Sequence, residues 1–440
     1  MKRTEFNTKF RQHTREKLSP TQREKDFVSA LYAELQKVLG VNNCIQIGSY
    51  PRFTAHTPLH DLDVLYFAGQ YDPRGVNPTN ILSDLKKAID RDFVNPTSYN
   101  VSSSLQTHSV TMSFASSGQE VFAIDIVPAY ISETKNEFGD DTYWVPEIMT
   151  VGHSKRKSMY EQHLRDHMAI EWIKSDPRGY IKVAQELNSQ NDDFRKAVKF
   201  VKAWKHGCKK IDDTFKLKSF HVEQIITQYF QQDSSLDLIG AIFKFFCDLE
   251  SIISQPQIRD RANSTKYIDD YLNELNPEQK RKILEARDFF MNKLERHTEA
   301  SPMPILLVGG FYERKSDSEQ FLYDLSIPTF IEDQYDFVVD GKVEKKDGFR
   351  GGYWLSENQD KAPTGLKIYF QLRKDNTGAP LCKWKVKNHD NCEQPRGELN
   401  DHRTRNHPES TAYKGEHYVE CYAIKNGACV ARHKRSVIIH

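Results

Sequence analysis

Two strand-like apolar runs carry acidic residues where an ordinary core strand would carry none. The first run is Asp61-Leu62-Asp63-Val64-Leu65-Tyr66-Phe67, and the second, Val121 to Val127, holds Asp125 near its middle. Side chains alternate between the two faces of a strand, so Asp61 and Asp63 share one face. An unpaired carboxylate is costly inside an apolar strand, so Asp125 needs a partner or a ligand. The pattern predicts three carboxylates converging on one side of a sheet.

Such an oxygen-rich site suits Mg²⁺, which binds carboxylates together with substrate phosphates. Two ions could clamp the attacking and leaving oxygens of a phosphoryl displacement, with Mn²⁺ as the alternative metal. Upstream, Gly48 would let the backbone approach a phosphate, and Ser49 offers a hydroxyl and an amide. Each piece also has an ordinary interpretation: a solvated strand edge, a turn, or an Asp paired with an Arg.

Together these residues resemble the polymerase-beta-like nucleotidyltransferases, which carry Gly-Ser, an Asp-x-Asp strand and a third strand Asp in this order. Two later segments, Phe200 to Trp204 and Leu217 to Glu223, are similar to those of the branch containing cyclic GMP-AMP synthase and oligoadenylate synthase. The resemblance implies that Lys202 and Ser219 contact nucleotide phosphates. The other interpretations are a solvated lysine face for Lys202 and a helix N-cap for Ser219.

A second resemblance covers the last third of the chain. It is similar to the adenylyl/guanylyl and SMODS C-terminal sensor domain attached to many bacterial members, called CD-NTases. The residues that carry it are Trp384 to Asn388, Arg396 to Glu398, Glu409 to His417 and Tyr418 to Tyr422. The two resemblances imply an antiphage signalling enzyme that makes a cyclic di- or oligonucleotide from NTPs and releases pyrophosphate.

The resemblance also implies partners. We expect NTP substrates, a nucleotide or phage-derived ligand at the C-terminal domain, and an effector protein bound only through the product. Two other functions stay open: a template-independent transferase acting on RNA ends or protein, and an inactive nucleotide-sensing module. Lys plus Arg number 62 against 61 Asp plus Glu, which argues weakly against a large RNA substrate.

The chain is too long for one core, and its patterns change twice along its 440 residues. We predict an α+β protein: a nucleotidyltransferase palm of mixed sheet plus helices over 1–155, a helical lobe over 156–300, and a small β-rich domain over 301–440. The palm sheet is expected to end near Pro146, with a helix over Tyr160 to Lys174 and hairpin turns at Asp340-Gly341 and Asn426-Gly427. No secretory signal and no apolar run long enough for a membrane are evident, so a cytoplasmic location is expected.

Overall fold

The computed structural model describes residues 2–106, 108–148, 170–298, 300–344, 352–401 and 408–440. Contacts between residues divide the chain into two compact units. One unit comprises 10–283, and the other joins 1–9 to 284–440. Each unit is described by itself. The three-part division predicted from the sequence stays a prediction.

The first unit begins in the second half of α1 (Arg3–His13), which is followed by α2 (Gln22–Leu39). The N-cap of α2 is Thr21, whose side chain accepts from the Glu24 amide while Glu24 accepts from the Thr21 amide. This capping box satisfies two backbone donors that would otherwise lack partners. It fixes the start of the helix at Gln22.

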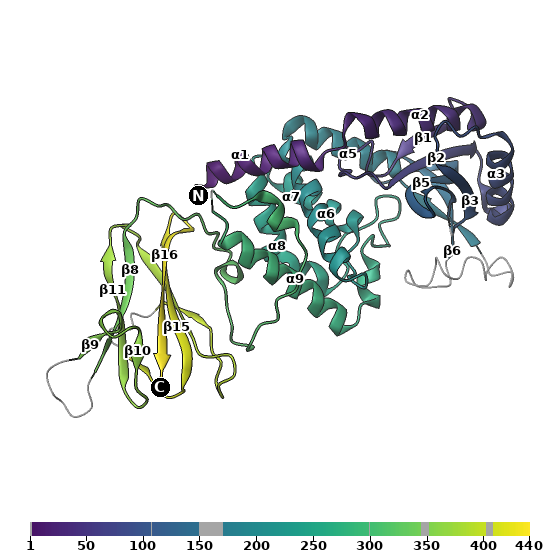
Figure 1. The fold of residues 1–440 in the computed structure, drawn as a ribbon. Helices are drawn as coiled ribbons and strands as arrows, with labels where there is room; N and C mark the ends of the chain where they lie inside the picture. Colours follow the sequence, from purple (N-terminus) through teal and green to yellow (C-terminus); the bar gives the residue numbers. More distant parts are fainter. Residues whose placement is uncertain (1, 107, 149–169, 299, 345–351, 402–407) are drawn as a thin grey trace. The chain divides into compact units, whose positions relative to one another are not determined.

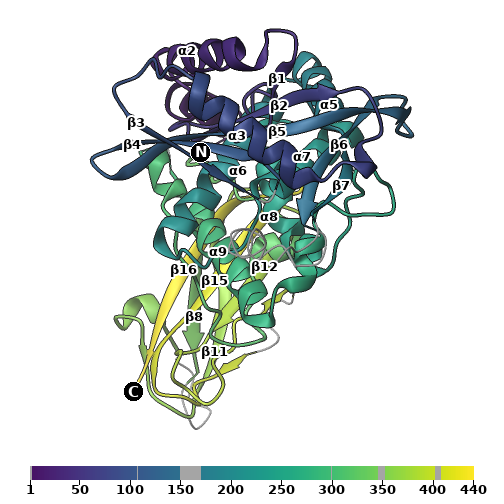
Figure 2. The same cartoon turned by 90° about the vertical axis from the view of Figure 1, so that its right-hand side faces the viewer.

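A mixed sheet forms the palm of this unit, in the order β1-β2-β5-β4-β3, with β6 beside β5 and β7 beside β6 (Figures 1 and 2). Its central pair, β2 and β5, is parallel, and the other neighbours are antiparallel. The helices α2 and α3 (Pro78–Asp92) bury their apolar stripes on one face, against side chains such as Leu62 and Ile124. The strands are β1 (Cys44–Ile47), β2 (Asp61–Gly69), β3 (Asn100–Leu105), β4 (Val110–Ser116), β5 (Gln119–Lys135), β6 (Asp141–Ile148) and β7 (Ile170–Ser175).

The sheet extends further along the chain than predicted. The helix expected over Tyr160 to Lys174 lies partly outside the described residues, and its described end, from Ile170, is strand β7. The reason is a period of two: Ile170 and Trp172 are buried, and Glu171 between them is exposed. The expectation of a helix at 170–174 was therefore wrong, and so was a sheet ending near Pro146.

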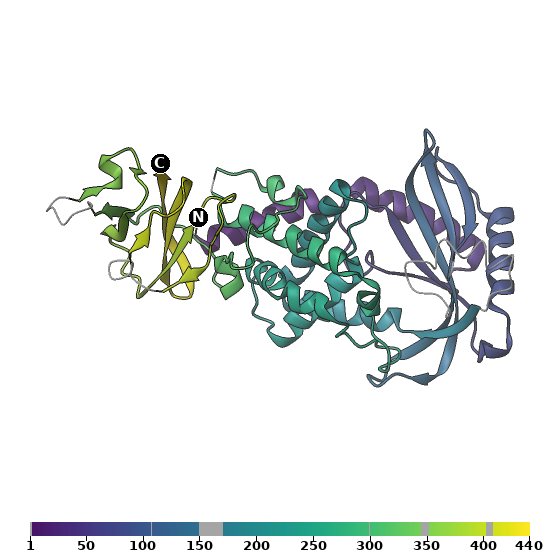
Figure 3. The ribbon, with the colours of Figure 1, turned by 90° about the horizontal axis from the view of Figure 1, so that it is seen from below.

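The helices that follow confirm the predicted helical lobe (Figure 3). The apolar faces of α6, α7 and α8 are buried, including the full side chain of Trp204. The helices are α5 (Pro177–Gln190), α6 (Asp193–Ile211), α7 (Ser219–Gln232), α8 (Leu238–Ser254) and the beginning of α9 (Pro277–Glu295), which belongs to this unit as far as Ile283. Within the described residues, no helix has both the length and the apolar character needed to cross a membrane.

The second unit contains two β-sheets that share one apolar core. One sheet has the order β10-β16-β15-β12-β13 and the other β14-β11-β8-β9. Buried side chains of both, among them Trp384 and Phe370, form a single cluster. The longer strands are β8 (Phe337–Val343), β11 (Lys367–Asp375), β12 (Leu381–Lys387), β15 (Gly415–Lys425) and β16 (Ala428–Ile439). The shorter strands are β9 (Tyr353–Trp354), β10 (Lys361–Ala362), β13 (Leu399–Asn400) and β14 (Glu409–Ser410). The α+β class, with a helical lobe and a β-rich C-terminal part, is confirmed.

One of the two predicted hairpin turns is present. Asn426 and Gly427 join β15 to β16 with φ values of 52° and 75°, the left-handed region that such turns need. The prediction at Asp340-Gly341 was wrong, because both residues lie inside β8. A Cβ on Gly341 would come within 2.7 Å of Leu355 and Ile368, so this glycine permits close packing rather than a turn.

Candidate active site

The structure brings the three predicted carboxylates to one region of the palm sheet. Asp63 on β2 is the register partner of Asp125 on the parallel neighbour β5, and Asp61 precedes Asp63 by one strand period. The alternation of both strands assigns these residues to the face that also carries Leu65 and Val127, opposite to the face covered by α2 and α3. Parallel pairing of two acid-bearing strands thus gathers residues that are far apart in the sequence.

Like charge and burial together dominate the electrostatics of this group. Burial, followed by the negative charges of Asp61 and Asp125, raises the pKa of Asp63 to about 7. Burial and Asp125 likewise raise the pKa of Asp61. The Asp125 carboxylate accepts hydrogen bonds from the hydroxyls of Thr111 and Ser109. These shifts mean that the site favours neutralisation of its negative charge.

This donor set fits a hard divalent cation. It consists of carboxylate oxygens, supplemented by the neighbouring hydroxyls, and its excess negative charge is the feature a cation would relieve. As they stand, the described side chains form no ready-made group of three or more His, Cys, Asp or Glu ligands. The carboxylates are therefore near neighbours whose fine positions a cation would have to adjust.

Gly48 fits against the acidic group in a way no other residue could. Its φ is +75°, and an added Cβ would lie 1.8 Å from Oδ2 of Asp63. The loop then turns back at once, because the carbonyl of Ser49 accepts from the amides of Thr54 and Ala55 at 3.1 and 3.2 Å. The predicted Gly-Ser pair is thus a tight turn that brings backbone directly beside a buried carboxylate.

Lys202 lies in a buried ionic network. Its Nζ is 2.5 Å from Oε2 of Glu223 on α7, and Nε of Arg52 is 2.5 Å from Oε1 of the same carboxylate. The Thr54 hydroxyl donates to Glu223 at 2.9 Å. Burial alone would raise the pKa of Glu223, but Arg52 and Lys202 lower it to about 2. The network ties the loop after Gly48 to two helices of the lobe, and the phosphate role of Lys202 stays a prediction.

Ser219 begins α7 and accepts a hydrogen bond of 2.7 Å from Nζ of Lys205. Its predecessor Lys218 occupies the N-cap position. Both Lys205 and Ser219 line a cavity of about 520 Å³. Burial and the neighbouring Lys209 and Lys202 lower the pKa of Lys205 to about 8, whereas Asp61 opposes that change.

Lys205 was not among the residues selected from the sequence, although a signal was present. Lys205 and His206 lie three and four residues after Lys202, so both are its neighbours on one side of α6. The ring of His206 stacks on that of His60, the residue before Asp61, with centroids 5.5 Å apart. Burial lowers the pKa of nearby His56 to about 4, which favours its neutral form. The acidic group is thus bordered by lysines and histidines of the lobe and the loop.

Comparison with known proteins gives a family for the C-terminal part. Residues 316–440 match the family model of the Adenylyl/Guanylyl and SMODS C-terminal sensor domain. No curated protein matches the chain.

Several solved structures are similar in fold at low sequence identity. E. coli MS115-1 CdnC, in its complex with HORMA-deltaN, is 18% identical with a TM-score of 0.46, and the match covers 70% of this chain and 95% of that one. The Elizabethkingia meningoseptica CdnE cyclic dinucleotide synthase, with GTP and Apcpp, is 14% identical with a TM-score of 0.40, over 61% and 91% of the two chains. The Bradyrhizobium diazoefficiens CD-NTase CdnG, in complex with GTP, is 10% identical with a TM-score of 0.40, over 62% and 86%. The resemblance recognised in the last third of the chain is confirmed: residues 316–440 match the C-terminal sensor domain.

Proposed function

We propose that this chain is a metal-dependent nucleotidyltransferase that makes a cyclic di- or oligonucleotide second messenger from NTPs. The observation that carries the proposal is the acidic group: Asp61, Asp63 and Asp125 on one face of two parallel strands, with Gly48 against Asp63. A role in antiphage signalling within the cytoplasm belongs to the same proposal. It is supported by the sensor-domain match of residues 316–440.

Two Mg²⁺ ions, or Mn²⁺ in their place, would be held by Asp61 and Asp63, with Asp125 binding the catalytic one. When bound, the metals supply charge neutralisation at the α-phosphate and at the departing pyrophosphate. Asp125 would accept the proton of the attacking 2′- or 3′-hydroxyl. The hydroxyl oxygen forms a bond to the α-phosphorus, and the bond from that phosphorus to pyrophosphate breaks. A second such attack between the two linked nucleotides closes the ring.

We assign phosphate binding to the loop that begins at Gly48 and to the helical lobe. Gly48 and Ser49 would approach the donor phosphates through backbone groups, and Ser219 would add its hydroxyl. Lys202 and Lys205 would add positive charge from α6, since both lie close enough to Asp61 for its charge to affect their pKa. Positioning and neutralisation of this sort account for most of the catalysis in phosphoryl transfer.

The two lysines can be separated by experiment. We expect Lys205→Ala to weaken binding of a non-hydrolysable NTP about tenfold or more, because it removes a charged donor beside Ser219. Lys202→Ala should weaken binding as well and should also lower the melting temperature, because it breaks the ion pair with Glu223. Isothermal titration and thermal unfolding of both variants give the two readouts. If NTP affinity is unchanged in Lys202→Ala while stability falls, Lys202 is a structural residue only.

The products distinguish this function from its alternatives. Labelled NTPs incubated with the protein and Mg²⁺ should yield, on thin-layer chromatography, a labelled product that survives phosphatase. Survival means that every phosphate is internal, as in a ring. A product that loses its label to phosphatase would indicate linear nucleotide addition or hydrolysis, and the absence of any product would favour a nucleotide-sensing module.

The C-terminal domain is proposed to bind a nucleotide or a phage-derived ligand, with the downstream effector contacted only through the product. A cavity of about 480 Å³ lies between β11 and β12. Its described lining holds two aromatic rings, an amide and two carboxylates but no Lys or Arg, so it suits the base of a nucleotide rather than the phosphates. Several aromatic and polar residues of the sensor resemblance serve the domain itself: Trp384, His417 and Tyr422 are buried, and Arg396 pairs with Glu398 and Glu409.

Ligand binding in that cavity should stabilise the domain. NTPs or the cyclic product should raise the melting temperature of the full chain, since a ligand that binds only the folded state adds stability. Gln371→Ala, which removes a neutral polar side chain from the cavity lining, should reduce the shift, whereas Asp333→Asn, an exposed change away from the cavity, should leave it intact. If Gln371→Ala shows the full shift, the ligand binds elsewhere.

A further inference from the structure

A second cavity of the first unit has a strong excess of positive charge. It measures about 850 Å³, within the range of small-molecule sites. Of its described lining side chains, six are Lys or Arg and one is an Asp: Arg11, Arg15, Lys25, Arg195, Lys196, Lys199 and Asp192. A neutral or apolar ligand could not compensate so many positive charges. We call it the basic pocket.

Among the described residues, three of these six cations have no acidic partner. Arg11 is bidentate to Asp193, and Arg195 and Lys196 share Asp192. Lys199, only 7% exposed, donates at 3.0 Å to the hydroxyl of Ser19. For Lys199, Arg15 and Lys25, the described part of the chain supplies no carboxylate within ion-pair distance. Three positive charges are therefore available to an anion.

The charged forms of two lysines are destabilised in the pocket. Burial and the neighbouring cations lower the pKa of Lys199 to about 8. Burial and two arginines, Arg11 and Arg15, do the same for Lys196. Each shift reports a charged form that is destabilised relative to water, and a bound polyanion would remove that destabilisation. Phosphate groups are the anions that Lys and Arg recognise best.

Aromatic side chains complete the lining. Phe53 is 53% exposed, and its φ of +60° is a strained backbone conformation for a bulky residue. The preceding residue, Arg52, is fixed by Glu223, so the loop presents Phe53 to the pocket instead of burying it. Tyr50 lines the same wall. An exposed ring beside clustered cations matches a ligand with both a planar base and phosphates.

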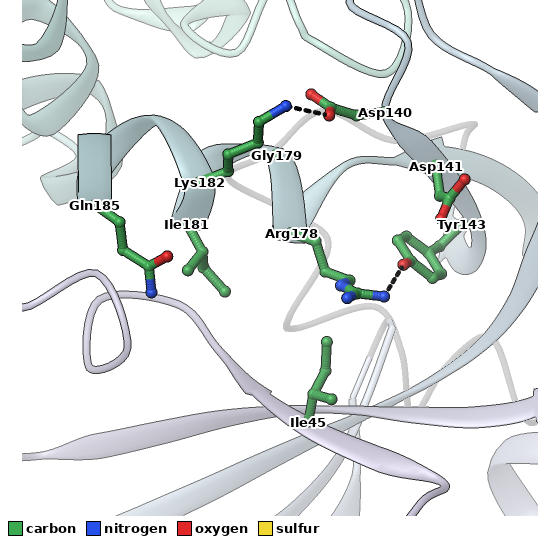
Figure 4. Close-up of a pocket in the computed structure, with 9 residues that line it drawn as sticks. All are labelled: Ile45, Asp140, Asp141, Tyr143, Arg178, Gly179, Ile181, Lys182 and Gln185. Atoms are coloured by element: carbon green, nitrogen blue, oxygen red, sulfur yellow. Dashed lines mark hydrogen bonds and ion pairs between the residues drawn. The ribbon is translucent and has the colours of Figure 1, made fainter. Parts of the chain in front are cut away.

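A smaller cavity of the same unit lacks this excess of positive charge. It measures about 330 Å³ and lies between α5 and β1 (Figure 4). Its lining includes Ile45, on the face of β1 opposite to Gln46, which lines the basic pocket. There Lys182 reaches Asp140 at 3.0 Å and Arg178 reaches the Tyr143 hydroxyl at 3.3 Å, while Asp141 offsets the second cation. Positive and negative side chains are equal in number, so this cavity has no comparable demand for an anion.

We propose that the basic pocket binds a nucleoside polyphosphate without a metal, at a site separate from the acidic group. The separation follows from β1: Gln46 lines the basic pocket, whereas the next residue, Ile47, is the register partner of Asp63 and points to the other face. The residues that line the pocket, as far as the chain is described, do not include the three carboxylates. The ligand's phosphates contact Lys199, Lys25 and Arg15, and its base lies on Phe53.

Binding of a non-hydrolysable ATP analogue to the full chain in EDTA tests the proposal, because chelation removes metal-assisted binding at the acidic group. The wild type should bind the analogue in EDTA. The double variant Arg15→Ala/Lys25→Ala should bind at least about tenfold more weakly, since two charge-assisted contacts are lost. Both residues are exposed, so the variant should fold. Lys209→Ala removes a lysine from the cavity of Ser219 instead and should bind like the wild type.

Two further probes fix the kind of ligand. Inorganic tripolyphosphate should bind more weakly than the analogue, and Phe53→Gly, which suits the positive φ, should remove that difference. No binding in EDTA, equal affinity in the double variant, or a loss only in Lys209→Ala would overturn the proposal. Tripolyphosphate binding as tight as the analogue, or tighter binding of a 20-base-pair duplex, would overturn it too and indicate another anion. None of these readouts depends on synthesis, so the site can fail or stand apart from the proposed activity.

Discussion

Asp63→Asn should abolish nucleotide synthesis while leaving the fold intact, and it should not lower the melting temperature. Burial, followed by the charges of Asp61 and Asp125, already raises the pKa of Asp63 to about 7. Removing its charge therefore relieves repulsion in the folded protein. Catalysis responds in the opposite direction, because a metal ligand is lost. We expect the rate to fall by roughly a thousandfold or more, equivalent to about 4 kcal/mol of transition-state stabilisation.

The combination of two readouts makes this test specific. Label incorporation at saturating Mg²⁺ measures the rate, and thermal unfolding measures the stability. Asp84→Asn is the matched control, since Asp84 is an exposed residue of α3 that pairs with Lys87 at the surface. A variant with near-normal turnover would refute the nucleotidyltransferase proposal. A variant that loses both activity and stability would show that Asp63 is needed for folding, and the acidic group would lose its catalytic interpretation.

The sequence predicted the acidic strands because their chemistry is local. Alternation within each run is enough to assign each of the three Asp residues to one face of its strand. The parallel register of β2 and β5 then makes Asp61, Asp63 and Asp125 neighbours. The helices of the lobe were predicted for the same reason, by their spacing of three and four. Strand β7 was missed because the sequence of 160–174 has the spacing of a helix. The alternation that marks the strand begins only at Ile170, near the end of that segment.

Contacts between distant residues could not be predicted in this way. Arg52 and Glu223 are separated by 171 residues, and neither carries a local signal that names the other. The same holds for the basic pocket, where the N-terminal segment meets α6. Lysines spaced along α6 suggested a solvated face or a phosphate site. Folding divides them instead: Lys199 enters the basic pocket, Lys202 the buried network, and Lys205 the cavity of Ser219.

Glu223→Gln should destabilise the first unit by about 3–5 kcal/mol, which is the usual effect of removing one partner of a buried ion pair. Glu223 is 1% exposed and holds two cations, Arg52 and Lys202, that are themselves 7% and 4% exposed. The amide leaves both cations buried without their ion-pair partner. Urea unfolding at neutral pH measures the change. Glu34→Gln, which breaks the surface pair with Lys37, is the control and should cost less than about 1 kcal/mol.

Acid and a second substitution test whether the charge is responsible. Because Arg52 and Lys202 depress the pKa of Glu223 from 4.5 to about 2, its contribution to stability is complete above about pH 4.5 and is lost as the pH falls through about 2. The difference between wild type and Glu223→Gln should therefore shrink below about pH 4. Lys202→Met should cost less in the Glu223→Gln background than alone, since it removes one of the uncompensated cations. A cost that is unchanged by acid and additive with Lys202→Met would mean that Glu223 acts through packing, and that the ionic network does not hold the loop of Gly48 to the lobe.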